Sequence, residues 1–271
     1  MPELPEVQTV VNSLHPKIIN KKILSFDLLW NKTLYTNNLN TLKSEISKLP
    51  KIISINRHGK YIIIKLNNKF IVFHLRMTGY LYHSININAK SSYIRCFFTL
   101  SNNSYLIYED IRKFGGFYYL DNLNVIFDKT GIDPMDINFS YDWISKNIKK
   151  RKKMIKSLLL DQRFICGIGN IYADEILWLS KIHPKMPANN INANKVNKLY
   201  TNILKILNNS IKYHGTTIIN FKFDNMKTGT YKNQLTVYGR QNQNCKRCNN
   251  IIHRQKIAGR STFFCKFCQK Y

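Results

Sequence analysis

Four of the six cysteines form two close pairs near the C-terminus, and this spacing constrains the fold more than any other feature. Cys245-x2-Cys248 is followed, 16 residues later, by Cys265-x2-Cys268. Both pairs can present their sulfurs to one tetrahedral ion at about 2.3 Å, and four thiolates suit Zn²⁺ or an iron–sulfur centre. So short a segment has too little core to fold alone, so the metal must supply folding free energy. The pattern predicts one structural Zn²⁺; two disulfides would need an oxidising compartment that nothing else indicates.

The chain also carries a large excess of positive charge. It has 42 Lys and Arg residues against 15 Asp and Glu residues, a formal net charge of +27, and no acidic residue after Asp224. Such a charge favours a polyanionic partner, with nucleic acid as the first candidate. Lysines outnumber arginines 32 to 10, which is typical of A+T-rich coding. Part of the charge therefore reflects coding bias.

Membrane and secretory signals are missing from the sequence. No run of 18 apolar residues occurs, so no membrane span is expected. The N-terminal MPELPEVQTV has two glutamates where a secretory signal carries cations. We expect a soluble, cytoplasmic monomer, which DNA binding would associate with the nucleoid.

Hydrophobic periodicity predicts strands first and helices later. Short alternating stretches separated by polar turns indicate a sandwich or barrel of mainly antiparallel strands, at 51–55, 61–66, 70–75, 96–100 and 105–108. A helix is expected behind Pro5, over 5–14. The turn-rich stretch 128–140 is the best domain boundary. Helical periodicity follows over 141–159, 171–179 and 196–213.

The N-terminus has the composition of a nucleophilic site. Removal of Met1 would expose the secondary amine of Pro2, and an α-amino group titrates near 7.7–8.0. A secondary amine that attacks an aldehydic carbon gives an iminium ion, an electron sink for elimination chemistry. Glu3 and Glu6 lie close enough in sequence to move or orient protons there. Taken alone, however, these residues are more typical of an ordinary helix start.

Six motifs occur in a characteristic order. They are PELPEV at 2–7, HLRMTG at 74–79, DIRKFG at 110–115, GIGNIYADE at 167–175, TVYGR at 236–240 and the four-cysteine tail. Together they resemble the bacterial formamidopyrimidine-DNA glycosylase family over essentially the whole chain. The resemblance implies an α+β fold with an N-terminal β-sandwich and helix, a helix–two-turn–helix module and a zinc-finger hairpin. The implied domains are a catalytic sandwich (1–130), a DNA-binding domain with a lesion-capping loop (131–235) and the zinc finger (236–271).

The resemblance also implies the chemistry. The family excises oxidised purines from duplex DNA and cleaves the strand by β- and δ-elimination, and Pro2 matches its nucleophile. Glu3 matches the general acid, and Glu6 a supporting carboxylate. Lys60 matches a phosphate-contacting proton donor. Arg260 matches the zinc-hairpin arginine that clamps phosphate and takes part in δ-elimination.

Further positions match DNA contacts of the family. Extruding a base costs a few kcal/mol of unstacking, and apolar wedges with a cation fill the hole. Met77, Arg112 and Phe114 match this void-filling trio, with Arg112 donating to the orphaned cytosine. The remaining expected contacts are with the phosphate backbone, from His74, Arg151, Lys156 and Asn170. The loop 216–231 aligns with the segment that closes over the flipped purine.

Some features leave alternatives open. Ser91 stands where a histidine is common in the family, and Gln8 replaces a frequent glutamate. A sister group resembling endonuclease VIII uses the same proline chemistry on oxidised pyrimidines, although PELPE, Arg112 and Phe114 favour the purine enzyme. A zinc-containing DNA-binding protein without catalysis is the third alternative, and a retained Met1 would support it.

Overall fold

Two compact units make up the chain. Unit 1 contains residues 1–126 and 213–230, and unit 2 contains residues 127–212 and 231–271. The computed structural model describes residues 1–36, 38–87, 91–216, 223 and 227–271. Within this described part, no helix has the length and apolar character needed to cross a membrane. The division into three domains stays a prediction.

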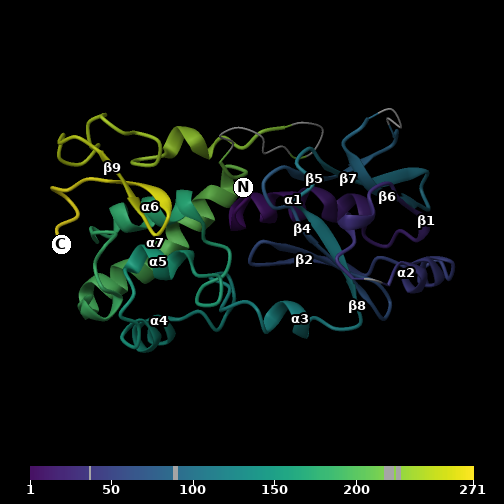
Figure 1. Ribbon diagram of the computed structural model, residues 1–271, viewed down its shortest axis with the longest axis horizontal. Coiled ribbons are helices and arrows are strands. Elements are labelled where there is room, and N and C mark those ends of the chain that lie inside the picture. The colour runs from purple at the N-terminus through teal and green to yellow at the C-terminus, as the bar shows by residue number, and fades with distance from the viewer. Residues whose placement is uncertain (37, 88–90, 217–222, 224–226) are drawn as a thin grey trace. The chain divides into compact units, whose positions relative to one another are not determined.

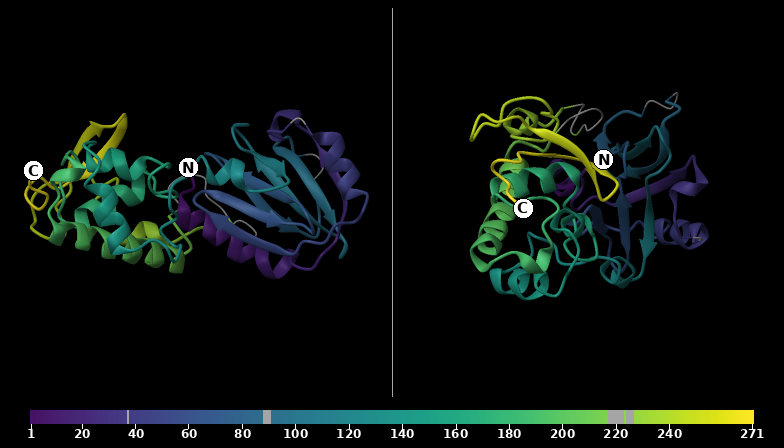
Figure 2. Two further views of the ribbon diagram at one scale, coloured as in Figure 1. Left: turned by 90° about the horizontal axis from the view of Figure 1, so that it is seen from below. Right: turned by 60° about the vertical axis from the view of Figure 1, so that its left-hand side comes forward.

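Unit 1 is a β-sandwich, which confirms the expected α+β class. Its two antiparallel four-stranded sheets have the orders β1-β6-β7-β5 and β2-β3-β4-β8 (Figure 2). The strands are β1 (Ile23–Leu28), β2 (Ser54–His58), β3 (Tyr61–Lys65), β4 (Phe70–His74), β5 (Gly79–Ser84), β6 (Ile94–Leu100), β7 (Ser104–Asp110) and β8 (Gly116–Leu120). Aromatic rings fill the space between the sheets: Phe73 and Phe117 of one sheet meet Phe26 and Phe98 of the other, with centroids 5.8–6.4 Å apart between the sheets.

Helix α1 (Leu4–Ile18) closes one open edge of the sandwich. It packs against β2 and β5, the edge strands of the two sheets (Figure 1). Its buried stripe runs from Val7 to Ile18, four residues beyond the predicted end, because the apolar periodicity continues to Ile18. A second helix that the sequence did not indicate, α2 (Leu39–Ile46), packs against β1.

Unit 2 combines helices with the zinc-finger hairpin. Its elements are α4 (Tyr141–Ile148), α5 (Ile155–Leu160), α6 (Asn170–Leu179), α7 (Ala193–Lys212), β9 (His253–Ile257) and β10 (Arg260–Phe264), and α3 (Asn124–Phe127) spans the boundary between the units. Helix α6 packs against α5, α7 and β10. The helical periodicity predicted over 141–159 corresponds to two helices, α4 and α5, with a break between them. That break holds five consecutive cations, 149–153, and like charges four residues apart destabilise a helix.

Candidate functional site

The start of the chain is buried around two carboxylates. Pro2 is buried, and only 3% of Glu3 and 2% of Glu6 are exposed. Glu6 Oε2 accepts a hydrogen bond from the Glu3 N–H at 2.8 Å, and the Glu3 carboxylate accepts one from the Glu6 N–H. This reciprocal capping box begins α1. It fixes the backbone next to Pro2.

Glu6 also holds the start of the predicted lesion-capping loop. Its Oε1 accepts the N–H of Thr216 at 2.6 Å. Gly215 makes this approach possible: its φ is +81°, and a Cβ there would lie 2.7 Å from Glu6 Oε1. Thr216 belongs to the loop expected to close over the lesion, whereas no role was predicted for Gly215. Residues 217–222 and 224–226 of that loop lie outside the described residues.

Lys60 sits in a tight turn anchored to α1. Gly59, with φ +56°, and Lys60 connect β2 to β3, and only 7% of Lys60 is exposed. The Arg57 guanidinium donates to Gln8 Oε1 at 2.9 Å and to the Gly59 carbonyl at 3.1 Å. Gln8, which replaces a frequent glutamate, therefore still holds this hairpin, through a neutral acceptor.

His74 is a buried neutral imidazole at the end of β4. Its Nδ1 accepts the N–H of Arg76 at 3.1 Å, and its ring meets the Tyr61 ring edge-on with centroids 4.8 Å apart. Burial, followed by the charges of Arg76 and Lys60, lowers the pKa of His74 to about 3. With Nδ1 accepting, the remaining proton of the neutral ring is on Nε2.

The predicted void-filling trio comes together in unit 1, although its members lie on two loops. The side chains of Met77 and Phe114 are 44% and 53% exposed. Arg112 Nη1 lies 3.2 Å from Met77 Sδ, and its Cζ lies 4.8 Å from the centroid of the Phe114 ring. Two exposed apolar side chains joined by a cation give this surface the composition of a wedge.

A buried carboxylate that the sequence analysis did not single out fixes both loops. Asp110 is fully buried, and its Oδ1 accepts the Thr78 hydroxyl and the Arg112 N–H, the latter at 3.1 Å. Its Oδ2 accepts the Gly115 N–H at 2.7 Å. Asp110 thus holds the residue after Met77 and the backbone on both sides of Phe114. It lies in the DIRKFG motif, which is the signal that could have identified it.

In unit 2 a buried ion pair ties the hairpin to the helices. Lys156 and Asp174 have side chains with no exposed surface, and Lys156 Nζ lies 2.7 Å from Asp174 Oδ1. Lys156 also donates to Thr262 Oγ1 at 2.7 Å and to the Ser261 carbonyl at 3.3 Å. Asp174 Oδ2 accepts the Phe263 N–H at 2.9 Å. Burial, opposed by the Lys156 ammonium, raises the pKa of Asp174 to about 7.

This geometry corrects the expected role of Lys156. From the family resemblance we expected Lys156 to contact the DNA backbone, as we did for Arg151. The structure buries it completely, where its ammonium compensates Asp174 instead of reaching a phosphate. Arg151, within the same run, is exposed, as a phosphate contact requires.

Asn170 and Arg260 lie on segments that are joined to each other. Asn170 begins α6, and its Nδ2 donates to the carbonyl of Ser261, the neighbour of Arg260, at 2.8 Å. Arg260 is exposed at the start of β10. Gln162, to which no role was assigned, shapes the loop before Asn170: it accepts the Gly167 N–H at 2.9 Å and donates to the carbonyl of residue 168 at 2.8 Å. The hydrogen bond from Asn170 to Ser261 thus holds the two candidate phosphate contacts, Asn170 and Arg260, on connected segments.

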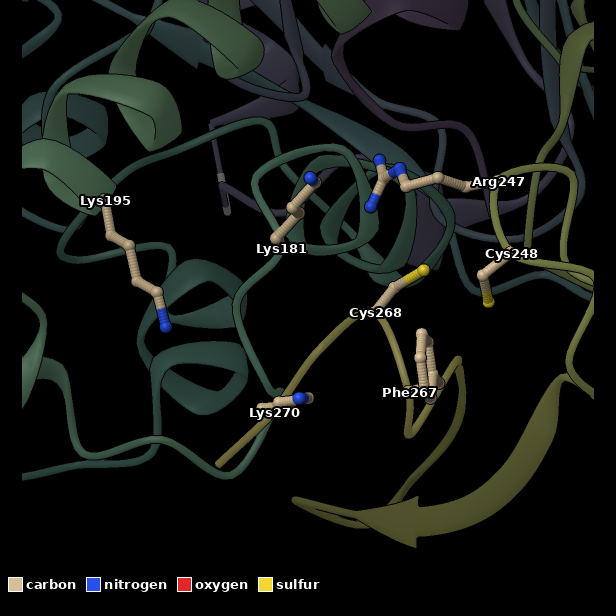
Figure 3. A pocket seen from close by; sticks show the side chains of 7 residues that line it. All are labelled: Lys181, Lys195, Arg247, Cys248, Phe267, Cys268 and Lys270. Atoms are coloured by element: carbon tan, nitrogen blue, oxygen red, sulfur yellow. The ribbon is translucent and has the colours of Figure 1, made fainter.

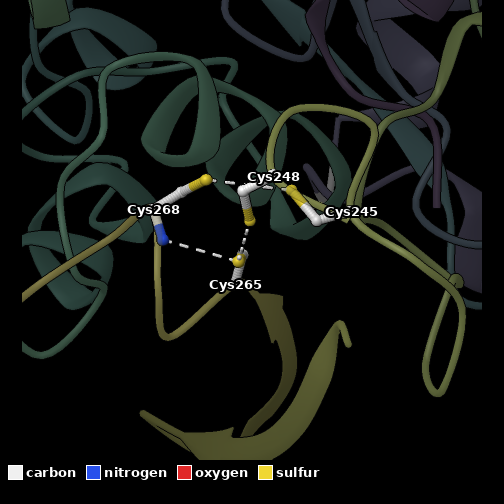
Figure 4. A group of neighbouring side chains, drawn as sticks. All are labelled: Cys245, Cys248, Cys265 and Cys268. Atoms are coloured by element: carbon white, nitrogen blue, oxygen red, sulfur yellow. Dashed lines mark hydrogen bonds between the residues drawn. The ribbon is translucent and has the colours of Figure 1, made fainter. Parts of the chain in front are cut away.

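The four tail cysteines form a metal site (Figure 4). Their sulfurs all lie within 4.8 Å of one another, with Cys245 and Cys268 3.9 Å apart and Cys248 and Cys265 3.5 Å apart. A tetrahedral ion with bonds of about 2.3 Å needs sulfurs about 3.8 Å apart, so the cluster fits Zn²⁺ and no pair is a disulfide. The Trp178 indole N–H donates to Cys245 Sγ at 3.3 Å, as expected for a ligand thiolate.

Zinc removal should unfold the tail. We expect the purified protein to contain one Zn²⁺ per chain, and a strong chelator to lower the melting temperature, because the metal supplies the folding free energy of this segment. Elemental analysis and thermal denaturation measure both effects. Cys248→Ser should lower the zinc content, whereas Cys96→Ser, in the sandwich core, should not. A chelator-resistant melting temperature would contradict this account.

Breaking the buried ion pair should be costly. Lys156→Met leaves the Asp174 carboxylate buried without its cation, so we expect a loss of about 3–5 kcal/mol in the free energy of unfolding. The double variant Lys156→Met, Asp174→Asn should recover part of this loss. Urea denaturation of the single and double variants measures the coupling. Strictly additive losses would show that the pair does not act as a unit.

The neutral state of His74 should make the fold acid-sensitive. Its folded pKa of about 3 lies below the unfolded value of 6.5, so its contribution is present above pH 6.5 and is lost as the pH falls toward 3. Relative to His74→Gln, the wild type should lose up to about 1.4 kcal/mol per pH unit in this window. Parallel stability–pH curves for the two proteins would refute a buried neutral histidine.

Comparison with known proteins identifies the family. Three family models match: the formamidopyrimidine-DNA glycosylase N-terminal domain over residues 1–117, the formamidopyrimidine-DNA glycosylase H2TH domain over 130–222, and the zinc finger found in FPG and IleRS over 242–270. The formamidopyrimidine-DNA glycosylase of Protochlamydia amoebophila is 38% identical over 277 residues, covering 100% of both chains. That of Mycoplasma pneumoniae is 37% identical, covering 99% of both.

Solved structures also match this chain over almost its whole length. The Lactococcus lactis Fpg in complex with abasic-site DNA matches with a TM-score of 0.91 and 33% identity, covering 99% of this chain and 100% of that one. A mutant of the L. lactis protein with Fapy-dG DNA matches with a TM-score of 0.92 and 33% identity, covering 100% of both. The sandwich, the helical module and the four-cysteine hairpin therefore have counterparts in one protein, and the chain belongs to the formamidopyrimidine-DNA glycosylase family of DNA-repair enzymes.

Proposed function

We propose that the protein binds damaged duplex DNA, excises oxidised purines such as 8-oxoguanine and formamidopyrimidines, and then cleaves the strand by β- and δ-elimination. It acts as a cytoplasmic monomer on nucleoid DNA. The observation that carries the proposal is the buried N-terminal cluster, in which Pro2 lies beside Glu3 and Glu6. Family membership supports it.

The chemistry begins at the Pro2 nitrogen after removal of Met1. An amine of pKa near 8 is partly unprotonated at neutral pH and can attack C1′ of the damaged nucleotide. The C1′–N bond breaks, the base leaves with a proton, and Glu3 protonates the sugar-ring oxygen as the ring opens to an iminium. Loss of a C2′ proton then breaks the C3′–O bond, and a second elimination breaks the C5′–O bond. Glu6, fixed by two N–H groups, positions the cluster.

The remaining residues hold the DNA and the leaving phosphates. Lys60 and Arg260 contact the phosphates released in the two eliminations. The neutral His74, with its proton on Nε2, and Asn170 donate to the backbone, and exposed Arg151 adds a charge contact. Met77, Arg112 and Phe114 fill the space of the extruded base. The segment beginning at Thr216 closes over the lesion.

Oxidised pyrimidines are the second candidate substrates. The L. lactis Fpg, 33% identical to this chain, has also been crystallised with DNA containing an oxidised pyrimidine. Purines remain the favoured substrates, because the family resemblance assigns to Arg112 a hydrogen bond to the cytosine left unpaired opposite the lesion.

Analysis of reaction products tests the function. Duplexes carrying 8-oxoguanine opposite cytosine or an oxidised thymine are incubated with wild type and Pro2→Gly, and the strand ends are resolved. We expect excision of 8-oxoguanine and a gap with phosphate on both sides for the wild type, and loss of both steps for Pro2→Gly. Faster excision of the oxidised thymine would shift the substrate class to pyrimidines. Tight binding without cleavage of either duplex would favour the non-catalytic alternative.

Asp110 should affect extrusion of the damaged base, because it holds the two loops that carry Met77, Arg112 and Phe114. Asp110→Asn removes the charge and one acceptor oxygen for three donors, so we expect excision to slow by about 10-fold or more, with smaller effects on undamaged-duplex binding. A fluorescent base analogue opposite or beside the lesion reports extrusion directly. Glu109→Gln, on the preceding partly exposed residue, is the matched control. Unchanged extrusion in Asp110→Asn would show that the loops keep their geometry without it.

A further inference from the structure

A hollow of about 430 Å³ lies in unit 2 beside the zinc finger, and two of the zinc ligands, Cys248 and Cys268, form part of its wall (Figure 3). Its size falls within the range of small-ligand sites, about 300–1,000 Å³. Its lining residues come from the end of α6, the start of α7 and the cysteine-rich tail, and are Lys181, Lys195, Arg247, Cys248, Phe267, Cys268 and Lys270. The hollow lies at the C-terminal end of α6. Asn170 is at the other end of this ten-residue helix, about 15 Å away.

The hollow carries uncompensated positive charge. None of the three lysines that line it forms an ion pair with an acidic group in the described part of the chain. The surrounding segments, 176–212 and 231–271, contain 15 Lys and Arg residues and no Asp or Glu. Zinc with four thiolates bears a formal charge of −2, which offsets only two of the four lining cations.

The cations that line the hollow differ in their contacts. Arg247 lies 3.9 Å from the Trp178 ring centroid and donates to the carbonyls of Trp178 and Leu179, which satisfies the end of α6. Lys195 lies in the first turn of α7, where the helix dipole disfavours a cation. No side-chain hydrogen bond joins it to the described residues. An anion bound in the hollow would offset that cost.

An exposed aromatic ring completes the site. Phe267, between the last two cysteines, is 59% exposed, and Lys270 Nζ lies 5.6 Å from its ring centroid. Exposed rings next to cations are the elements with which proteins bind single-stranded nucleic acid, because the ring stacks on a base and the cations meet the phosphates. A duplex conceals its base faces, so the ring favours an unpaired nucleotide.

We propose that this hollow is a second nucleic-acid site, which takes a single-stranded segment. One base stacks on Phe267, and the flanking phosphates contact Lys181, Lys195 and Lys270. The site goes beyond the proposed function, since it requires no chemistry at Pro2.

Binding of a short labelled oligothymidine to the full-length zinc-loaded protein tests the proposal. An unlabelled lesion-analogue duplex in excess occupies the lesion site, and anisotropy follows the oligonucleotide. The pocket variant is Lys181→Gly, Lys195→Gln, Lys270→Gln. Glycine is chosen at 181 because that residue has φ +56°, a conformation that glycine adopts without strain. The control, Lys205→Gln, Lys212→Gln, Lys232→Gln, removes the same charge from exposed lysines outside the hollow.

We expect the oligonucleotide to bind in the presence of the duplex. The pocket variant should weaken oligonucleotide binding about 10-fold or more. It should also lower the magnitude of the slope of log K against log salt concentration by about two, since three phosphate contacts are lost. Phe267→Ala should weaken binding at least about 5-fold without changing the salt dependence. The control should stay within about 2-fold, and lesion cleavage, zinc content and melting temperature should match the wild type in all variants.

Three outcomes would overturn the proposal. Complete displacement of the oligonucleotide by the duplex would show a single site. Equal losses in the pocket and control variants would show diffuse attraction by surface charge. Displacement by polyglutamate with no effect of Phe267→Ala would assign the hollow to an acidic protein segment. Failure of the wild type to cleave any lesion would refute the proposed function and leave pocket-dependent oligonucleotide binding as a separate result.

Discussion

Buried carboxylates are the constraint on which the structure of this basic chain depends. Of its 15 acidic residues, at least six have almost no exposed surface, and at least four of these accept hydrogen bonds from backbone N–H groups of other segments or of adjoining loops. A buried carboxylate is tolerated only when several donors replace its hydration, so each of these groups specifies the position of the segment that supplies the donors. The four are Glu6, Asp110, Asp174 and Glu175.

Each carboxylate joins parts that are distant or loosely structured. Glu6 holds residue 216 against α1, and Asp110 holds two loops that lie more than 30 residues apart. Neighbouring residues of α6 do the same in unit 2: Asp174 fixes β10, and Glu175 accepts three consecutive N–H groups, of residues 236–238. Little negative charge is left on the surface around these segments. A cationic surface on loops that are fixed from within suits a protein that binds the phosphates of DNA.

The sequence predicted the fold class and the zinc ligands, and it indicated that Met77, Arg112 and Phe114 lie together, because each has a local signal. The void-filling role of these three residues stays a prediction. The cysteine spacing is such a signal, and so is the pair of motifs that carries Met77 and Arg112. Strands β1, β5 and β8 were missed: β1 and β5 contain polar residues, and β5 and β8 begin at a glycine, which weakens a strand signal. The roles of Gly215, Asp110 and Gln162 depend on hydrogen bonds that spacing does not reveal. Lys156 was misassigned for the same reason, since its partner Asp174 is 18 residues away.

Covalent trapping tests the central claim, that the buried N-terminal cluster is the catalytic centre, most directly. Borohydride reduces an iminium to a stable amine, so the protein is treated with it in the presence of 8-oxoguanine duplex and the adduct is located by peptide mass mapping. We expect one sugar fragment bound to the nitrogen of residue 2, in a peptide that lacks Met1. An adduct on a lysine such as Lys60 would contradict the role of residue 2. Release of the base without any covalent adduct would contradict it as well.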